Sequence, residues 1–278
     1  MWVPTGMILN LEISFVPFFY LCSKSQTMIK LSAVIITFNE ERNIERCLNS
    51  LKGIADEIIV VDSFSTDNTA AICEDAGVRF IEQKWLGYSA QKNLGNSLAS
   101  YEYVLSIDAD EALSEELKKS ILAIKTSGFK GACSFNRMTN YCGKWIRHSG
   151  WYPDTKVRIF NKNTSVWQGA LHETLTLDNI VIEHLSGDLL HYSYYTRDDH
   201  IRQIIKFTDI AALDYFKSGK KHSPVKLYGS PAAKFIRDYF INLGFLDGKA
   251  GLTICRLSAK ATYLKYSKLK KLWRLEKS

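Results

Sequence analysis

Apolar and polar positions alternate in blocks along residues 31–128, and the length of each block predicts the element that it forms. Residues 31–37 are an almost unbroken apolar run rich in β-branched side chains. A run of this kind is typical of a strand that is buried on both faces of a parallel sheet. Similar runs predict further strands at residues 57–61, 78–81 and 103–107.

Apolar residues recur at helical spacing in the segments between these strands. They predict helices at residues 41–51, 68–76 and 89–99, and another from Ser114 onward. The resulting β-α-β-α-β-α-β order predicts an α/β fold built on a doubly wound, mostly parallel sheet.

Polar residues gather where the predicted strands end, at residues 37–40, 62–67 and 108–110. Ligands of doubly wound sheets bind outside the carboxyl ends of the strands, so these loops are expected to meet at one crevice. Asp108 and Asp110 would point the same way at the end of an extended segment. Two such carboxylates favour a cation such as Mg²⁺, which binds one or two carboxylates together with phosphate oxygens. A solvated turn before an acidic helix start is the alternative.

The pattern changes in the second half of the chain, where short strand-like segments alternate with aromatic loops. Residues 131–137 and 156–160 are the clearest of these segments. Helical spacing returns at residues 197–216. A loop rich in glycine and proline then separates this helix from a final helical segment.

Positive charge is concentrated at the end of the chain. The net charge is +7, and residues 249–278 carry nine Lys or Arg against one acid, which leaves −1 for the rest. Residues 252–273 mix this charge with large apolar side chains, which favours a basic amphipathic helix on an anionic membrane surface. A helix packed on the core, with Lys and Arg facing water, is the alternative. No recognition motif accompanies the charge, so nucleic acid is not expected as a partner.

Four motifs occur in order along the predicted sheet: VIITFNE at 34–40, VVDSFSTDNT at 60–69, QKNLG at 91–95 and IDADE at 107–111. As a set they resemble the family 2 glycosyltransferases. Later segments resemble a branch of that family that includes lipopolysaccharide-core β-glucosyltransferases: VRIF at 157–160, HE at 172–173, LHYS at 190–193 and GFLDG at 244–248. The resemblance implies a GT-A fold, a nucleotide-sugar donor, a divalent metal (Mg²⁺ or Mn²⁺) and inversion at the anomeric carbon.

The resemblance also implies roles for individual residues. Asp110 would hold the metal, Asp108 would contact the ribose or the metal, and Lys92 would lie near the diphosphate. Asp62 would accept a hydrogen bond from the base, although an aspartate at this position could instead cap a turn. The rest of the predicted nucleotide-sugar site consists of Thr37, Phe38, Asn39, Glu40, Ser63 and Ala109.

Inversion by direct displacement needs a base on the acceptor hydroxyl, and a carboxylate is the usual choice. Glu173 is the predicted base, because many members of the family carry an acidic residue in the corresponding segment. His172 is the alternative base, or an ordinary loop histidine. His191 is predicted to be a packed core histidine rather than a residue that closes over the donor.

These expectations describe an inverting glycosyltransferase that moves a sugar, by default from a UDP-sugar, to a lipopolysaccharide-core or related glycolipid acceptor. A polyprenyl-phosphate sugar synthase is the alternative enzyme, and a nucleotide-binding module without turnover is the alternative from another class. The absence of G-x-G-x-x-G after the first strand and of a P-loop argues against nicotinamide and P-loop enzymes. The absence of Q-x-x-R-W favours the addition of single sugars.

The expected organisation has three parts. Residues 1–27 are interpreted as an extension or a mis-assigned start before Met28, with a short membrane-associating segment as the alternative. Residues 28–220 would form the catalytic domain, and residues 221–278 a basic helical tail. Six scattered cysteines without a C-x-x-C pair are interpreted as reduced thiols. We therefore expect a cytoplasmic protein held peripherally on the inner face of the membrane.

Overall fold

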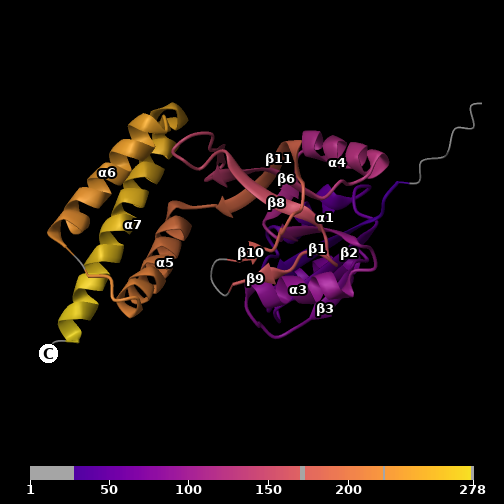
Figure 1. Ribbon diagram of the computed structural model, residues 1–278, viewed down its shortest axis with the longest axis horizontal. Coiled ribbons are helices and arrows are strands. Elements are labelled where there is room, and N and C mark those ends of the chain that lie inside the picture. The colour runs from indigo at the N-terminus through magenta and orange to yellow at the C-terminus, as the bar shows by residue number, and fades with distance from the viewer. Residues whose placement is uncertain (1–27, 170–172, 222, 277–278) are drawn as a thin grey trace, which may run out of the picture.

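The computed structural model describes residues 28–169, 173–221 and 223–276. The expectations for residues 1–27 and for His172 lie outside these described residues. Figure 1 shows a lobe built around a sheet and, at the other end, a group of helices formed by the end of the chain. We call them the sheet lobe and the helical part. The cysteines within the described ranges are free thiols, as expected.

The first half of the sheet lobe confirms the predicted alternation of strands and helices. It consists of β1 (Leu31–Thr37), α1 (Ile44–Leu51), β2 (Glu57–Asp62), α2 (Thr69–Asp75), β3 (Arg79–Glu82), α3 (Tyr88–Leu98) and β4 (Tyr103–Asp108). The strands pair in parallel in the order β3-β2-β1-β4. Because the strand order reverses between β1 and β4, the carboxyl ends of these strands border a crevice.

Both faces of the parallel strands are buried, as the apolar run of β1 predicts. Ala33 and Ile35 face a core that is covered by α1 and by α4 (Glu115–Ser127). Val34 and Ile36 face the opposite core, which is covered by α3. At Gly95, α3 lies so close to β1 that a Cβ atom would come within 2.3 Å of Val34 Cγ1, so only glycine fits without displacement.

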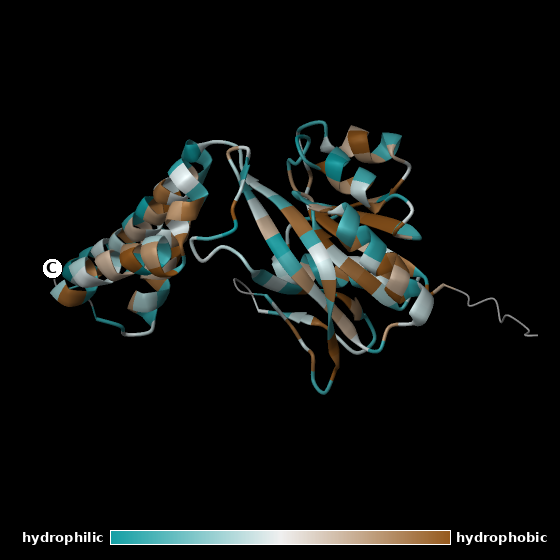
Figure 2. Cartoon of the chain, turned by 90° about the horizontal axis from the view of Figure 1, so that it is seen from above, coloured by the Kyte–Doolittle hydropathy of each residue, from teal (hydrophilic) through white to brown (hydrophobic). Residues whose placement is uncertain are grey.

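The second half of the sheet lobe adds antiparallel strands. It contains β5 (Glu111–Leu113), β6 (Ala132–Tyr141), β7 (Lys144–Trp145), β8 (Asp154–Asn161), β9 (Trp167–Gln168), β10 (Thr174–Leu175) and β11 (Ile182–Tyr194). β8 lies between β4 and β6 and is antiparallel to both, whereas β11 is parallel to β6. The central sheet is therefore parallel in its first half and mixed in its second. Hydrophobic residues run along its strands (Figure 2).

The helical part consists of α5 (Arg197–Lys217), η1 (Val225–Gly229), α6 (Ser230–Ile236), η2 (Arg237–Ile241), η3 (Gly244–Asp247) and α7 (Gly248–Leu275). α7 contacts both α5 and α6 and buries Ile254, Leu257 and Leu269 (Figure 1). The predicted basic helix therefore exists, but its apolar side packs against its neighbours. Across the described residues, no helix is long and apolar enough to cross a membrane.

An aromatic cluster joins the start of α5 to the sheet lobe. The rings of Tyr141, Trp151, Tyr194 and His200 lie with centroids 4.6 to 5.9 Å apart. The cluster fixes α5 against β6 and β11 and so places this helix beside the crevice. The division between residues 28–220 and 221–278 remains a prediction, although α5, which it assigns to the first part, packs along α7.

Candidate active site

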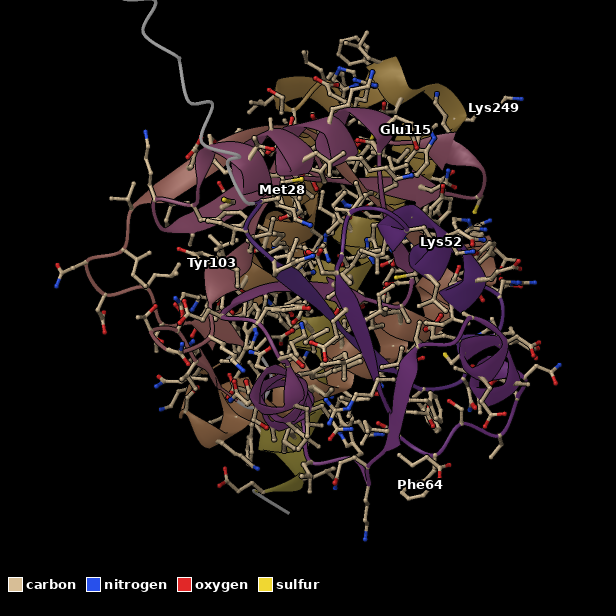
Figure 3. All side chains as sticks on the ribbon, turned by 90° about the vertical axis from the view of Figure 1, so that its right-hand side faces the viewer. Met28, Lys52, Phe64, Tyr103, Glu115 and Lys249 are labelled. Carbon is tan, nitrogen blue, oxygen red and sulfur yellow. The ribbon has the colours of Figure 1, made fainter. Side chains whose placement is uncertain are left out.

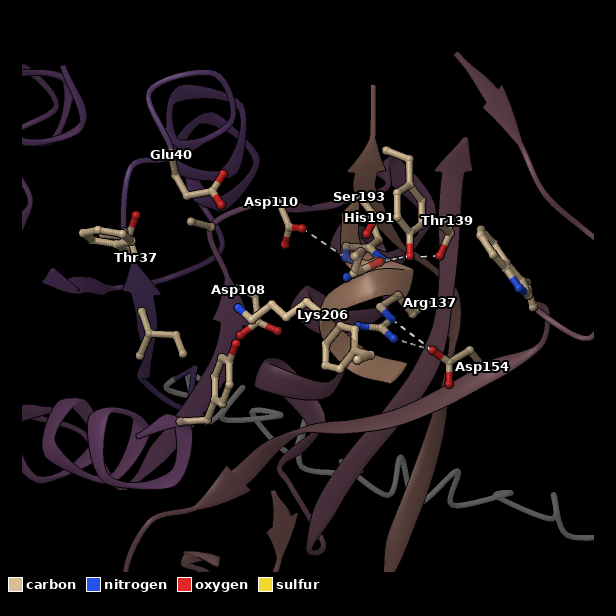
Figure 4. A pocket seen from close by; sticks show the side chains of 18 of the residues that line it. Thr37, Glu40, Asp108, Asp110, Arg137, Thr139, Asp154, His191, Ser193 and Lys206 are labelled. Atoms are coloured by element: carbon tan, nitrogen blue, oxygen red, sulfur yellow. Dashed lines mark hydrogen bonds and ion pairs between the residues drawn. The ribbon is translucent and has the colours of Figure 1, made fainter. Parts of the chain in front are cut away.

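A cleft of about 1180 Å³ opens at the carboxyl ends of β1, β2 and β4 (Figure 4). The loops after these strands supply one wall, and β6, β11 and α5 supply the other. The polar loops that were predicted to converge do meet here. The predicted site residues that line the cleft are Thr37, Phe38, Glu40, Ser63, Asp108, Ala109 and Asp110.

The carboxylate of Asp108, at the end of β4, is held between two buried cations. Its Oδ1 lies 3.2 Å from Lys92 Nζ, and its Oδ2 accepts a hydrogen bond of 3.0 Å from Arg158. Burial would raise the pKa of Asp108, but Arg158 and Lys92 outweigh burial and hold that pKa well below its usual range. Arg158 also donates to the buried Glu111, at 2.9 Å. The negative charge of Asp108 is therefore balanced within the protein.

Asp110 lies in the turn after β4, and its carboxylate faces His191 of β11 (Figure 4). Asp110 Oδ2 is 3.1 Å from His191 Nε2, and His191 Nδ1 is 3.3 Å from the hydroxyl of Thr139. Burial lowers the pKa of His191, but Asp110 raises it by more through its charge and its hydrogen bond. The prediction of a packed core histidine is wrong, because the His191 ring lines the cleft.

The cleft offers only part of the predicted metal site, and it differs from the prediction in two ways. The two aspartates do not share an extended segment, because Asp110 belongs to a turn. Asp110 and His191 offer an oxygen and a nitrogen donor to the cleft, whereas Asp108 is already neutralised. Within the described residues, no group of three or more His, Cys, Asp or Glu side chains is arranged to hold a metal. An ion bound here would need further oxygen ligands, and phosphate oxygens are usual partners of Mg²⁺.

Residues 37–40 form the wall of the cleft beyond β1. The Oγ1 atom of Thr37 is buried and makes no hydrogen bond to any described residue, which is uncommon for a buried hydroxyl. Glu40 accepts a hydrogen bond of 2.8 Å from the side chain of Asn43. Burial, together with the charge of Asp110 and other acids, raises the pKa of Glu40 to about 7. This wall therefore combines an unpaired hydroxyl with a carboxyl group that titrates near neutral pH.

Two predicted nucleotide-binding residues have other partners. Asn39 lines a smaller hollow next to the cleft, and its side-chain oxygen accepts a hydrogen bond of 2.8 Å from the backbone N–H of Thr66. Asp62 is buried, and its two oxygens accept bonds of 2.7 Å and 2.5 Å from the N–H and hydroxyl of Ser65. Asp62 thus caps the turn after β2, which is the alternative that its sequence context allows.

Lys92 and Glu173 form an ion pair behind Asp108. The side chain of Lys92 is only 2% exposed, and its Nζ lies 3.1 Å from Glu173 Oε1. The same ammonium lies 4.9 Å from the ring centroid of Trp167. The predicted base therefore does not line the cleft but is linked to Asp108 through one lysine. The lysine itself lies beneath the site rather than on its surface.

Two contributors to the site were not predicted from the sequence. Arg158 belongs to the VRIF segment, but its partners are more than forty positions away in the chain and become visible only once β8 is placed beside β4. The helix α5 contributes Gln203, Lys206 and Phe207 to the cleft. Lys206 forms no ion pair with the described residues. Nothing in its helical spacing distinguishes it from an ordinary solvated lysine.

Comparisons with known proteins agree on one family. A family profile described as "Glycosyl transferase family 2" matches residues 32–183. An uncharacterized glycosyltransferase of Rickettsia typhi is 33% identical over 258 residues, which cover 88% of each chain. The lipopolysaccharide core biosynthesis glycosyltransferase LpsC of Rhizobium meliloti is 29% identical over 260 residues, covering 86% of this chain and 94% of LpsC.

Among solved structures, residues 1–349 of S. aureus TarS in complex with UDP match with a TM-score of 0.44 and 16% identity. This match covers 89% of the present chain and 92% of the TarS fragment. Glucosyl-3-phosphoglycerate synthase of Mycobacterium tuberculosis, in complex with Mn²⁺, UDP and glucosyl-3-phosphoglycerate, matches with a TM-score of 0.35 and 22% identity. That match covers 40% of the present chain and 44% of the synthase.

Proposed function

The chain belongs to glycosyl transferase family 2, and from this premise we propose that it transfers a hexose, with inversion, from a nucleotide-diphosphate sugar to a surface glycolipid. The observation that carries the proposal is the Asp110–His191 pair, which faces the cleft at the carboxyl end of β4. In this proposal the pair would hold the divalent ion that stabilises the negative charge developing on a leaving diphosphate.

The donor would lie along the loops after β1, β2 and β4. Thr37 offers an unpaired hydroxyl to the nucleoside, and Phe38, whose side chain is 55% exposed, offers an apolar surface to it. Asp108, fixed in orientation by Lys92 and Arg158, is the proposed acceptor of ribose hydroxyls. Asp62 would help indirectly by holding the turn that carries Ser63.

Asp110 and His191 are the residues that would hold Mg²⁺ or Mn²⁺. When bound, such an ion supplies Lewis-acid stabilisation of the leaving diphosphate. The protein itself orients this pair. The hydroxyl of Thr139 contacts the second ring nitrogen of His191 and so fixes the direction of the imidazole. Glu40, with its raised pKa, adds a negative charge to this end of the cleft as the pH rises past about 7.

Glu173 remains the proposed base, acting on the acceptor hydroxyl. Its carboxylate would take the proton of that hydroxyl while the oxygen attacks the anomeric carbon and the diphosphate departs. The ion pair with Lys92 holds this carboxylate in a fixed position. For this role the acceptor must extend from the cleft past Asp108 to Glu173, which Lys92 links to Asp108. A Glu173→Gln variant should then lose turnover while it retains donor binding.

The likeness to LpsC supports a lipopolysaccharide-core or related acceptor. The α5 wall of the cleft fits an acceptor with anionic groups, since it presents the ammonium of Lys206 beside the amide of Gln203. The acceptor would then enter between α5 and the turn that holds Asp110. UDP-glucose is the first donor to test.

The test is a transfer assay with a panel of nucleotide sugars, truncated lipopolysaccharide cores and polyprenyl phosphate, with and without Mn²⁺. We expect transfer to a core acceptor with an inverted anomeric configuration, and loss of that transfer in Asp110→Asn but not in the exposed control Asp75→Asn. Transfer to polyprenyl phosphate alone would favour the synthase alternative. Donor binding without transfer to any acceptor would favour a nucleotide-binding module.

A further inference from the structure

Residues 225–246 of the helical part expose an unusual number of large apolar side chains. Val225 is 78% exposed and Ile241 is 71% exposed. Soluble surfaces scatter such residues singly, whereas a group of them marks an interaction site. We call this group the apolar face; it consists of Val225, Tyr228, Ile236, Phe240, Ile241, Leu243, Phe245 and Leu246.

The apolar face spans η1, α6, η2 and η3. Val225, Tyr228, Ile236 and Phe240 recur at close to helical spacing, and its other members lie at and after the end of η2. Ring contacts connect its later part: Tyr239 lies 5.1 Å from Phe240 and 6.1 Å from Phe245, centroid to centroid. On the other side, α6 packs on α7. The apolar face therefore belongs to a segment that packs on α7 and still leaves these side chains exposed.

The charges around this face are almost all positive. The acid within this segment, Asp238, is buried and pairs with Lys234 at 2.8 Å. Asp247, directly after the segment, is also buried and accepts a hydrogen bond of 2.9 Å from the backbone N–H of His148. Neither acid reaches the solvent beside the apolar side chains. Exposed lysines flank both ends of the segment, namely Lys220, Lys221, Lys226 and Lys249, the last of which projects into solvent in Figure 3.

We propose that the apolar face docks on an anionic phospholipid leaflet. The aromatic and aliphatic side chains would enter the boundary between headgroups and acyl chains, and the flanking lysines would contact lipid phosphates. This moves the membrane contact from the basic helix at 252–273 to residues 225–246, because α7 uses its apolar side for packing. The inference goes beyond the proposed function and does not depend on it.

Charge complementarity favours a lipid surface over a second copy of the chain. In a symmetric dimer the same face would meet itself, so the flanking lysines of both copies would approach each other. Like charges at an interface oppose association. An anionic leaflet instead neutralises these lysines while it accepts the apolar side chains. The occupant that matches both properties of the surface is therefore the bilayer.

The test is sedimentation of the full chain with vesicles of phosphatidylcholine, with or without added phosphatidylglycerol, over a range of NaCl concentrations. We expect binding to the anionic vesicles that weakens with salt. The double variant Phe240→Ser/Ile241→Ser should weaken this binding roughly tenfold or more. The matched control is Val181→Ser/Ile182→Ser, an adjacent pair on the sheet lobe that is 63% and 47% exposed; it should bind as the unmodified chain does.

Three results would overturn the inference. One is no binding of the unmodified chain to anionic vesicles, and another is equal loss of binding in both double variants. The third is a concentration-dependent dimer that Phe240→Ser/Ile241→Ser abolishes, because a second copy would then cover the face. Thermal unfolding of each variant shows that the protein is folded, and the neutral substitutions Lys220→Gln and Lys226→Gln should reduce binding without changing unfolding.

Discussion

The cleft buries charged side chains, whereas the apolar face exposes hydrophobic ones. In both regions the side chains lie outside the environment that is usual for their type. Lys92 and Arg158 are at most 5% exposed in their side chains, yet both pair with the carboxylate of Asp108. Ile241 and Val225 are more than 70% exposed although each could cover a core. Neither arrangement stabilises the fold. Burying a charge costs free energy, and an apolar side chain that stays in water contributes no hydrophobic stabilisation. Each therefore points to a surface or site that binds something else.

The two regions also differ in how they tolerate change. The cleft depends on compensation among several charges, so removal of one cation leaves its buried carboxylate partners with fewer counter-ions. The apolar face has no partner inside the protein, so loss of one of its side chains should leave the fold intact. Substitutions in the cleft should therefore have larger effects than substitutions on the apolar face.

Arg158→Met should be the most damaging substitution for stability. It keeps much of the side-chain volume but leaves Glu111, which is 1% exposed, and Asp108 without their shared cation. We expect a loss of roughly 3–5 kcal/mol in the free energy of unfolding, measured with urea. Arg202→Met is the matched control, because Arg202 is 71% exposed and its one ion pair among the described residues is with Asp199. A small effect of Arg158→Met would show that the cleft charges are not compensated as described.

Asp110→Asn should reduce catalysis rather than stability. The amide keeps the size of the side chain but removes the charge that faces His191. We expect kcat to fall by roughly a hundredfold to a thousandfold, with the melting temperature little changed. The readout is initial transfer rate over a range of Mn²⁺ concentrations. An unchanged rate at every concentration would remove Asp110 from the proposed site.

His200, at the junction between the two parts, should make stability depend on pH. Burial lowers the pKa of His200 to about 4, whereas the unfolded chain has an ordinary value of 6.5. The unfolded state therefore binds more protons below 6.5, so stability is fully present above that value and falls as the pH falls. From about pH 7 to about pH 5 this linkage amounts to roughly 2 kcal/mol. His200→Gln should flatten the curve of unfolding free energy against pH by that amount, and a curve of unchanged slope would contradict the prediction.

Much of the sheet lobe could be predicted from sequence because each element there has its own local signal. The apolar run of β1 and the helical spacing of α1 are properties of short segments, and the loops after β1, β2 and β4 follow from the parallel order. The mixed second half could not be predicted in this way. β8 pairs with β4 and β6 through contacts between distant segments, and no local pattern specifies which strands become neighbours.

The same limit explains what was missed at the site and on the surface. The pairing of Asp110 with His191 needs β11 to pair with β5, where His191 lies opposite Glu111, and the segment around His191 does not show this by itself. The sequence of the basic helix at 252–273 has the same amphipathic pattern whether its apolar side contacts lipid or protein. Only the positions of α5 and α6 decide that it meets protein. Packing partners, rather than residue types, separate the correct interpretation from the wrong one here.

Two isoleucines of the helical part, one exposed and one buried, should differ in how much their loss changes the free energy of unfolding. Ile241→Ala should change the free energy of unfolding by less than about 0.5 kcal/mol, because the side chain is 71% exposed and loses few contacts. Ile254→Ala removes the same atoms from α7, where the side chain is fully buried, and should cost roughly 2–5 kcal/mol. Urea unfolding of both variants without vesicles measures the difference. If Ile241→Ala were as costly as Ile254→Ala, the apolar face would be packed against the protein itself and could not be the surface that meets a membrane.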